Sequence, residues 1–223
     1  MPYYPVFLDL RGRKVLVVGG GSVAERKIDT LLEFGGTVCV VSRQLTPTLA
    51  GYLEKGKIRF DSGEFKESHL NEVFLVIAAT DDPLLNRRVS RFARERGILV
   101  NAVDQPADCT FIVPSTLRRG DLVVAVSTSG KSPALARRLR EQLEETFGKE
   151  YETFLVLLGE IRREILSRGL SQEENGEVFR RLVDSDLLSA IRQKDWELAA
   201  SILRTVTGRE WSGADLLKTL RGT

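Results

Sequence analysis

Residues 15–27 read VLVVGGGSVAERK, and this stretch constrains the fold more than any other part of the chain. The apolar run Val15 to Val18 predicts a buried strand, and apolar residues at helical spacing after it predict a helix that ends at Gly35 and Gly36. The glycines between them fit G-x-G-x-x-G/A, whose first glycine permits the turn, whose second leaves room for a pyrophosphate and whose small third residue allows close packing. We therefore expect a dinucleotide to bind here, at Gly19, Gly21, Ser22, Val23 and Ala24.

The first half of the chain alternates strand-like with helix-like segments. Further strand-like runs lie at 37–41, 57–61, 73–79 and 98–101, and helical patterns lie at 47–53 and 83–96. This alternation predicts a Rossmann-like α/β fold, a doubly wound parallel sheet with helices on both faces, over residues 1–113. Ligands of such sheets bind beyond the carboxyl ends of the strands, so the residues that follow each strand are the candidates for a site.

The second strand does not end as the dinucleotide motif leads one to expect. An acidic residue about 20 positions after the glycines would hold the ribose hydroxyls of NAD, but the chain reads Ser42-Arg43-Gln44. Arg43 could contact a 2′-phosphate and favour NADP, or it could stack on adenine while Ser42 and Gln44 bind the ribose. The sequence leaves both readings open.

Two later strands also end in small or polar residues. The expected cofactor-binding residues there are Thr80, Asp81, Asn101 and Val103. Asp82 precedes Pro83 and is well suited to cap the helix that begins there. Asp104 has no long helix to cap, because its stretch NAVDQP is not followed by one, and it is therefore a candidate for chemistry.

After residue 113 the alternation stops. The stretches TFIVPS and DLVVAVSTSG predict two strands separated by TLRRG, close to a hairpin, and SPALARRLREQLEETFG predicts a helix with Ser132 as its N-cap. Residues 114–149 are thus expected to form a small α+β region. Residues 150–223 read as short amphipathic helices, a helical C-terminal domain with its clearest apolar stripe from Phe154 to Ile165.

Positive charge gathers in one part of the chain. Residues 114–140 hold six basic residues and one acid, although the whole chain carries only +2. Small hydroxyl residues, a glycine and a lysine before a helix N-terminus predict an anion-binding turn, formed by Ser127, Thr128, Ser129, Gly130, Lys131 and Ser132, with Arg137 on the helix. A substrate with several carboxylates or phosphates fits this turn. Nucleic acid does not, because neither interleaved aromatics nor a recognisable nucleic-acid-binding module accompanies the charge.

Other classes of protein are disfavoured by composition. Two cysteines and one histidine are too few for a disulfide scaffold or a closed zinc site, so no metal ligands are expected. The chain has no apolar run of about 18 residues, and its first residues, MPYYPVFLDLRGRK, lack the features of a signal peptide. The expectation is a cytoplasmic protein without a membrane segment.

Five stretches in this order resemble one family. PVFLDLRGRKVLVVGGGSVAERK, IAATDD, NAVDQP, FIVPS and AVSTSGKSPALARRLRE are similar to the precorrin-2 dehydrogenase/sirohydrochlorin ferrochelatase family, which also forms the N-terminal half of siroheme synthase. The resemblance covers about residues 5 to 147. Residue 128 is threonine where some relatives carry serine, and the chain as printed has no room for a methyltransferase domain.

The resemblance implies an activity and a set of partners. It implies NAD-dependent oxidation of precorrin-2 to sirohydrochlorin, followed in many members by insertion of ferrous iron to give siroheme. It also implies a homodimer in which residues 114–149 serve for dimerisation and substrate binding. Precorrin-2 carries eight carboxylates, which would account for the basic turn around Lys131. By the same resemblance, Asp104 is the essential aspartate and general base, and the tetrapyrrole lies between the two domains.

Three alternatives stay open from the sequence. The chain could be a dehydrogenase without chelatase activity, or a dehydrogenase that acts on an unrelated polyanion. It could also be a regulatory module that senses a dinucleotide, although that would predict a basic recognition helix in the tail, where both signs of charge mix throughout.

Overall fold

The computed structural model describes residues 3–169, 171–213 and 216, and it divides the chain into two compact units, Met1–Val113 and Pro114–Thr223. The first unit contains β1 (Lys14–Val18), α1 (Ser22–Glu33), β2 (Thr37–Ser42), α2 (Pro47–Glu54), β3 (Arg59–Ser62), the 3₁₀ turn η1 (Glu67–Leu70), β4 (Leu75–Ala78), α3 (Pro83–Glu95), β5 (Leu99–Ala102) and the 3₁₀ turn η2 (Pro106–Asp108).

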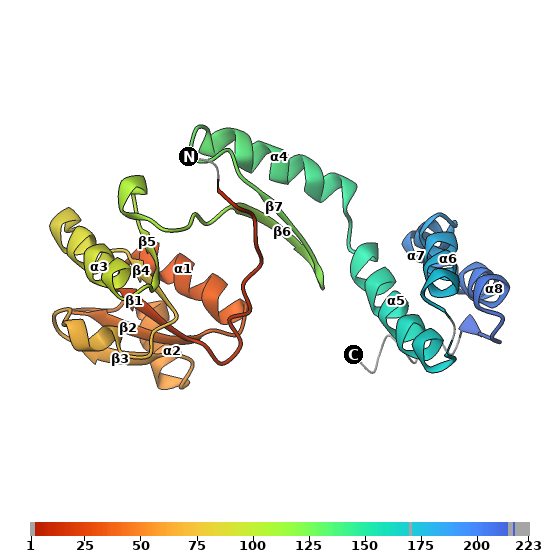
Figure 1. Cartoon of the computed structure of the whole chain (residues 1–223), viewed down its shortest axis with the longest axis horizontal. Coiled ribbons are helices and arrows are strands. Elements are labelled where there is room, and N and C mark those ends of the chain that lie inside the picture. The colour runs from red at the N-terminus through yellow and green to blue at the C-terminus, as the bar shows by residue number, and fades with distance from the viewer. Residues whose placement is uncertain (1–2, 170, 214–215, 217–223) are drawn as a thin grey trace. The chain divides into compact units, whose positions relative to one another are not determined.

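All five strands of the first unit pair in parallel, in the order β3-β2-β1-β4-β5 (Figure 1). This is the order of a doubly wound fold, as the alternation of segments predicts. Because β1 lies at the centre, the glycine turn that follows it stands between the ends of β2 and β4. The predicted helix stop is confirmed as well, since Gly35 has φ +76° and the Gly36 N–H donates to Leu31 O at 2.9 Å.

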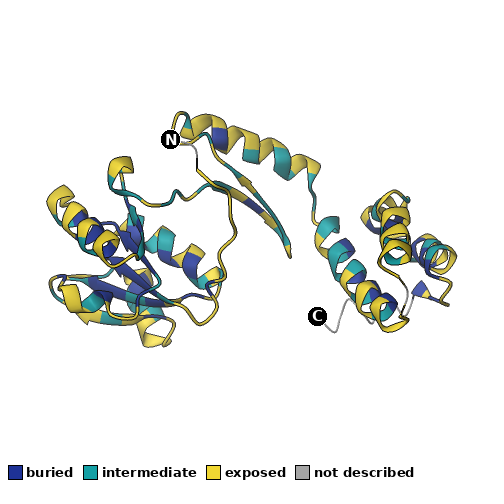
Figure 2. Cartoon of the chain, in the orientation of Figure 1, coloured by how far each residue is buried: buried dark blue, intermediate teal, exposed yellow. Residues whose placement is uncertain are grey.

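Both faces of the sheet are buried under helices, which explains the continuous apolar runs of its strands. On one face Val15 and Val17 pack with Ile28 of α1 and Leu49 of α2. On the other face Leu16 and Val18 belong to a second cluster with Val89 and Ala93 of α3. Figure 2 shows the strands as the most deeply buried part of this unit.

The second unit begins with a hairpin and continues with helices. It contains β6 (Ser115–Arg119), β7 (Leu122–Val126), α4 (Pro133–Thr146), α5 (Glu150–Ser167), α6 (Gln172–Val183), α7 (Leu187–Gln193) and α8 (Trp196–Thr207). The stripe predicted from Phe154 to Ile165 is confirmed as core, because Phe154, Leu157, Ile161 and Ile165 are all buried against α6 to α8. Among the described residues no helix has the length and apolar character needed to cross a membrane.

The hairpin differs from the prediction in its first strand. TFIVPS was expected as the strand and TLRRG as the turn, but β6 runs over Ser115–Arg119 and pairs antiparallel with β7, from Ser115 opposite Val126 to Arg119 opposite Leu122. The turn is therefore reduced to Gly120 and Asp121, with Gly120 at φ +57°. Leu117 points inward and is buried, while the neighbouring arginines, which make the stretch look like a loop, lie on a strand.

Helix α4 forms where it is predicted, but much of its apolar side is exposed within the chain. Ser132 caps it as predicted, because its hydroxyl accepts from Leu135 N at 3.2 Å. Its apolar residues are not core within the chain, since Leu135 and Leu139 are 48% and 37% exposed. Ala136 is the buried residue of this helix.

Candidate functional site: a dinucleotide pocket beside an aspartate in a left-handed turn

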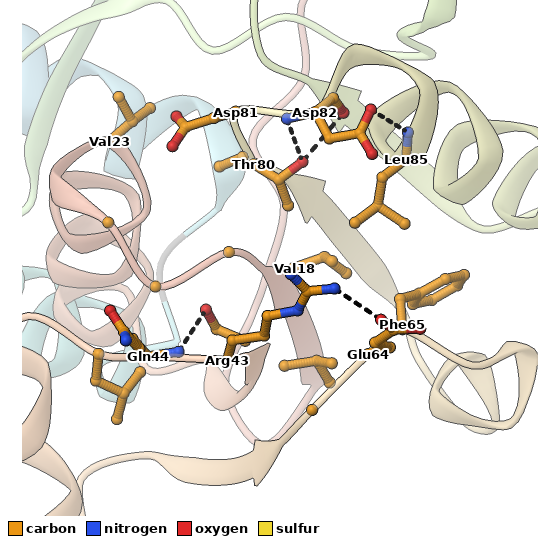
Figure 3. Close-up of a pocket in the computed structure, with 18 of the residues that line it drawn as sticks. Val18, Val23, Arg43, Gln44, Glu64, Phe65, Thr80, Asp81, Asp82 and Leu85 are labelled. Atoms are coloured by element: carbon orange, nitrogen blue, oxygen red, sulfur yellow. Dashed lines mark hydrogen bonds and ion pairs between the residues drawn. The ribbon is translucent and has the colours of Figure 1, made fainter.

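A pocket of about 980 Å³ lies at the carboxyl ends of β1 to β4 in the first unit. Its lining comes from the segments that follow these strands, as a doubly wound sheet predicts. The predicted residues that line it are Gly19, Gly21, Ser22, Val23, Ser42, Arg43, Gln44, Thr80 and Asp81 (Figure 3). This volume stands at the upper end of the range for small-molecule and cofactor pockets.

Each of the three glycines in the first turn has its own environment. Gly19 has φ +121°, and a Cβ there would lie 2.2 Å from Ala79 O, so the turn admits no side chain at this position. A Cβ on Gly20 would lie 2.0 Å from Gln44 O, because this residue packs against the end of β2. A Cβ on Gly21 would meet nothing within 4 Å, which leaves open space in front of α1.

The N-terminus of α1 opens onto the same pocket. Gly21 is its N-cap and no side chain caps the helix, so backbone N–H groups of the first turn are left for a ligand. These groups and the positive end of the helix dipole favour an anion. The first-turn acid, Glu25, accepts a hydrogen bond from the Thr46 hydroxyl. The residues here fit the pyrophosphate of a dinucleotide.

The turn after β4 is fixed by helix α3. Asn86 is buried, its Oδ1 accepts from Thr80 N at 3.1 Å and its Nδ2 donates to Thr80 O at 2.9 Å. Asp82 caps α3 as predicted, because its Oδ1 accepts from Leu84 N and Leu85 N at 2.9 and 3.2 Å. Asp82 lines the pocket together with Thr80 and Asp81, but its carboxylate is engaged by the helix.

A second pocket, of about 440 Å³, contains Asp104. It shares Val23, Ala79, Thr80 and Asp81 with the first pocket, so the two have a common wall. Asp104 is exposed and has φ +59°, in the left-handed region that few residues other than glycine adopt. Backbone in this region costs energy and is concentrated at functional sites, so its place in a pocket favours a functional role for Asp104.

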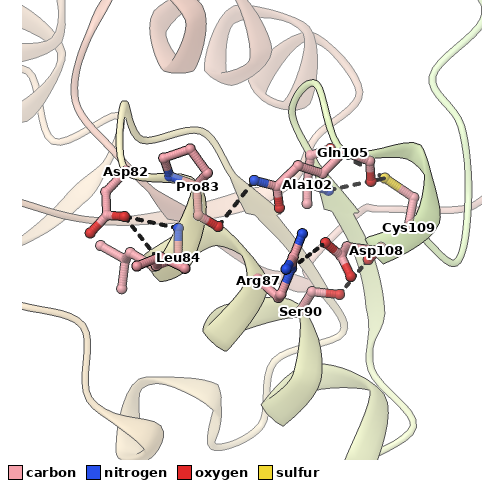
Figure 4. A network of polar contacts seen from close by, with 10 residues as sticks. Asp82, Pro83, Leu84, Arg87, Ser90, Ala102, Gln105, Asp108 and Cys109 are labelled. Carbon is pink, nitrogen blue, oxygen red and sulfur yellow. Dashed lines mark hydrogen bonds and ion pairs between the residues drawn. The ribbon is translucent and has the colours of Figure 1, made fainter.

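The turn that carries Asp104 is tied at both ends (Figure 4). The Cys109 thiol accepts from Ala102 N at 3.2 Å and donates to Gln105 O at 3.4 Å, which closes the loop on itself. The Gln105 Nε2 donates to Pro83 O at 3.0 Å and joins the loop to the start of α3. Burial raises the pKa of the Cys109 thiol, so this group stays protonated and can donate at neutral pH.

Helix α3 holds the far side of this loop too. The buried Ser90 hydroxyl donates to Asp108 O, and Arg87 Nε lies 3.3 Å from Asp108 Oδ2. Since Asn86 of the same helix fixes Thr80, one rigid element positions the turns on both sides of the shared wall. This arrangement fixes the backbone of the turn that carries Asp104 relative to the dinucleotide pocket.

Two of the predicted cofactor residues line neither pocket. Ala24 is fully buried in the core, as its packing role in the motif requires. The Asn101 side chain donates to Phe111 O at 3.1 Å, while Val103 lines the second pocket.

Other lining residues were missed from the sequence, among them Gly20, Glu64, Phe65 and Arg88. Glu64 follows the third strand, so the rule that picks out residues at carboxyl ends applies to it as well.

The predicted anion-binding turn lies in the second unit, between β7 and α4. Thr128 Oγ1 accepts from Ser132 N and donates to Ser132 O, both at 3.0 Å, and Lys131 N donates to Thr128 O at 3.0 Å. Ser129 has φ +52° and Gly130 φ +80°, which makes the turn tight. On α4, Arg137 Nε lies 3.0 Å from Glu141 Oε1, so this predicted residue is already paired.

Among the described residues there is no group of three or more His, Cys, Asp or Glu side chains that could hold a metal ion.

The fold, the glycine turn and the open N-terminus of α1 define a dinucleotide-binding protein of the Rossmann class. Residues 6–115 match the family described as "Putative NAD(P)-binding", and residues 119–146 match "Sirohaem biosynthesis protein central". These two matches make the chain similar to precorrin-2 dehydrogenases and siroheme synthases over both of its units.

Individual relatives agree with this assignment. The chain is 38% identical to a siroheme synthase of Actinobacillus succinogenes over 96% of its own length and 45% of the relative's. It is 42% identical to one of Methylobacillus flagellatus over 85% of its own length and 41% of the relative's. It thus spans less than half of either protein. A solved structure of SirC, a precorrin-2 dehydrogenase, is similar with a TM-score of 0.76 and 29% identity, covering 93% of this chain and 100% of that one.

Proposed function

We propose that this chain oxidises precorrin-2 to sirohydrochlorin with NAD⁺ as hydride acceptor, a step in the biosynthesis of siroheme. The observation that carries the proposal is Asp104, in a left-handed turn of a pocket that shares a wall with the dinucleotide pocket. The match to an NAD(P)-binding family and the similarity to SirC and to siroheme synthases support it.

Different residues are assigned to binding of the cofactor and to transfer of the proton. When bound, NAD⁺ supplies the acceptor for the hydride. Gly21 and the first-turn N–H groups of α1 hold the pyrophosphate, and Thr80 and Asp81 line the cleft next to the shared wall. As the hydride leaves the macrocycle, a carboxylate oxygen of Asp104 takes the proton that must leave with it, so that NADH, a proton and sirohydrochlorin result.

Two Asp104 variants test this assignment. Purified protein is mixed with NAD⁺ and enzymatically made precorrin-2, and the absorbance of sirohydrochlorin is followed. Asp104→Asn tolerates the left-handed backbone and keeps the shape of the side chain but cannot take the proton, so we expect NAD⁺ binding like that of wild type with turnover lowered at least about a hundredfold. Asp104→Ala is expected to behave alike. Unaltered turnover in either variant would remove Asp104 from the mechanism.

We further propose that the chain inserts ferrous iron into sirohydrochlorin, with the iron as a substrate. The same assay tests this step when ferrous or cobaltous ion is added after oxidation is complete. Metallation faster than the protein-free rate supports chelatase activity. Metallation at the protein-free rate would mean that the chain is a dehydrogenase without chelatase activity. A regulatory module that senses the dinucleotide would bind NAD⁺ and leave the spectrum of precorrin-2 unchanged.

The remaining proposals concern assembly and substrate binding. We propose a cytoplasmic homodimer whose contact uses the region 114–149, and the exposed Leu135 and Leu139 on α4 support this. The tetrapyrrole carboxylates are proposed to bind at the turn with Lys131, before α4. Analytical ultracentrifugation of the wild type and of Leu135→Glu tests the dimer: the variant is expected to be a monomer, and an unchanged mass would place the contact elsewhere.

A further inference from the structure

Two charged side chains of opposite sign meet at the edge of the dinucleotide pocket. Arg43 Nη2 lies 2.7 Å from Glu64 Oε1, and both residues line the pocket (Figure 3). Arg43 follows β2 and Glu64 follows β3. These strands pair in parallel with Ser42 opposite Ser62, and Gly63 N donates to Ser42 O at 3.0 Å. The two chains therefore leave the sheet side by side, which brings Arg43 and Glu64 to the same place.

The ion pair contributes little to the stability of the fold. The side chains of Arg43 and Glu64 are 79% and 75% exposed, and ion pairs with such exposure are weak because water screens them. No hydrogen bond to Arg43 or Glu64 other than the one between them is found in the described part of the chain. A pair that does so little for folding, at the mouth of a cofactor pocket, is available to act on the cofactor.

Glu64 lies near the place where a dinucleotide site needs an acidic residue, which the end of β2 does not provide. Many Rossmann sites that bind NAD place an acidic residue at the end of β2, where its carboxylate accepts from the ribose hydroxyls, and sites that bind NADP place an arginine near the 2′-phosphate. This chain has an arginine after β2 and a glutamate after the neighbouring β3. Glu64 brings a carboxylate to the carboxyl end of the sheet from the next strand.

The two cofactors meet this pair differently. The ribose of NAD⁺ is neutral at its 2′ position, so its hydroxyl can donate to the Glu64 carboxylate while Arg43 keeps its partner. The 2′-phosphate of NADP⁺ carries close to two negative charges, so it must displace Glu64 from Arg43 and then remain near a displaced carboxylate. Like charges placed together in a binding site oppose association.

We propose that Glu64 is a specificity-determining residue, which holds Arg43 and makes the pocket select NAD⁺ over NADP⁺. This inference rests on the proposed function, because it concerns the cofactor of the same pocket. In this proposal Glu64, after β3, supplies the carboxylate that the end of β2 lacks. Its ion pair keeps the Arg43 guanidinium from binding the 2′-phosphate.

Binding of both cofactors to four proteins tests the inference. NAD⁺ and NADP⁺ are titrated by calorimetry into wild type, Glu64→Gln, the double variant Glu64→Gln/Arg43→Gln and Glu67→Gln. The last is a matched control, because Glu67 forms an exposed ion pair with Arg96 at 2.9 Å and lines neither pocket. Melting curves accompany each titration to show that every protein is folded.

The expected pattern is specific to the pair. Wild type and Glu67→Gln bind NAD⁺ at least about tenfold more tightly than NADP⁺, since like charges close together oppose binding. Glu64→Gln frees Arg43, so NADP⁺ is expected to bind roughly tenfold more tightly than it does to wild type and NAD⁺ more weakly. The double variant loses the gain for NADP⁺, because that gain needs the guanidinium.

Three results would overturn the inference. A wild type that prefers NADP⁺ contradicts it without any variant, and so does a ratio of the two dissociation constants that is the same in wild type and Glu64→Gln. In both cases the protein binds a dinucleotide, and the proposed oxidation of precorrin-2 stands, in the first case with NADP⁺ in place of NAD⁺ as the hydride acceptor. A folded wild type that binds neither cofactor would overturn the proposed function together with the inference.

Discussion

Replacement of Gly21 by alanine separates cofactor binding from folding. Gly21 has φ −85° and ψ −174°, which any residue adopts, and its added Cβ would meet nothing within 4 Å. Alanine restricts the unfolded chain, which stabilises the fold by about 0.4–1 kcal/mol, but it is a poorer N-cap than glycine by a similar amount. We therefore expect Gly21→Ala to leave the free energy of unfolding within about 1 kcal/mol of the wild-type value, a change in Tm of at most about 4 °C for a chain of this size.

The same methyl group should impair binding of the dinucleotide. It occupies the space through which a phosphate would approach the N–H groups of α1, and hydrogen bonds to a charged group contribute about 1.5–3 kcal/mol each. Loss of one such bond raises Kd by roughly ten- to a hundredfold. Calorimetric titration of NAD⁺ into wild type and Gly21→Ala, together with thermal melting of both, measures the two effects on the same samples.

Gly20→Ala provides the contrast, because its Cβ would lie 2.0 Å from Gln44 O and 2.8 Å from Ser42 Oγ. Forcing the β1 turn away from the end of β2 is expected to cost about 1–3 kcal/mol of stability. A folded Gly21→Ala that binds NAD⁺ with the Kd of wild type would refute the placement of the pyrophosphate at this helix. A Gly21→Ala protein as unstable as Gly20→Ala would refute the open space in front of it.

Three further expectations concern acid stability, thiol reactivity and substrate binding. Burial raises the pKa of Glu164, but hydrogen bonds from Arg168 and Arg209 outweigh this effect and hold the pKa below its ordinary value. The stability that results is present above about pH 4.5 and is lost as the pH falls through the lowered pKa. Glu164→Gln should thus lower the free energy of unfolding at pH 7 by roughly 1 kcal/mol and less in acid; urea denaturation that shows an equal loss at pH 7 and pH 3 would contradict this. The raised pKa of Cys109 predicts that iodoacetamide modifies it more slowly at pH 7.5 in the folded protein than in the unfolded chain, and equal rates by mass spectrometry would argue against its burial. Lys131→Glu should raise KM for precorrin-2 more than KM for NAD⁺, and equal changes in steady-state assays would argue against the turn as the tetrapyrrole site.

The sheet and its glycine turn could be predicted from the sequence because their signals are local. The run Val15–Val18 predicts β1 to within a residue, and the helical spacing after it predicts α1 with an end about two residues beyond the observed one. The runs of the central strands β1 and β4 are easy to recognise because helices cover both faces of the sheet, so nearly all of their residues are apolar. The role of Asp82 as the N-cap of α3 could also be predicted, because a cap and its helix are neighbours in sequence.

The hairpin and the Arg43–Glu64 pair depend on contacts that local patterns do not contain. β6 consists of Ser-Thr-Leu-Arg-Arg, and it is a strand because β7 pairs with it and Leu117 is covered. Arg43 and Glu64 are 21 residues apart and meet only because β2 and β3 are neighbours in the sheet. The sequence analysis singles out Arg43 but not its contact with Glu64, and the proposed cofactor preference depends on that contact.

The net positive charge counted over residues 114–140 overstates the charge that helix α4 has free for a ligand, because it leaves out contacts with residues beyond that range. The window 114–140 stops just before Glu141 and Glu144, yet a helix brings residues four apart together, so Arg137 and Arg140 find their acidic partners beyond it. Lys131 precedes the helix and has no ion pair among the residues described. Reversing its charge should therefore weaken binding of a polycarboxylate more than reversing that of Arg137, which Glu141 already neutralises in part. If Arg137→Glu proved the more damaging of the two, the anion would bind along the face of α4 and the turn before it would be a structural cap.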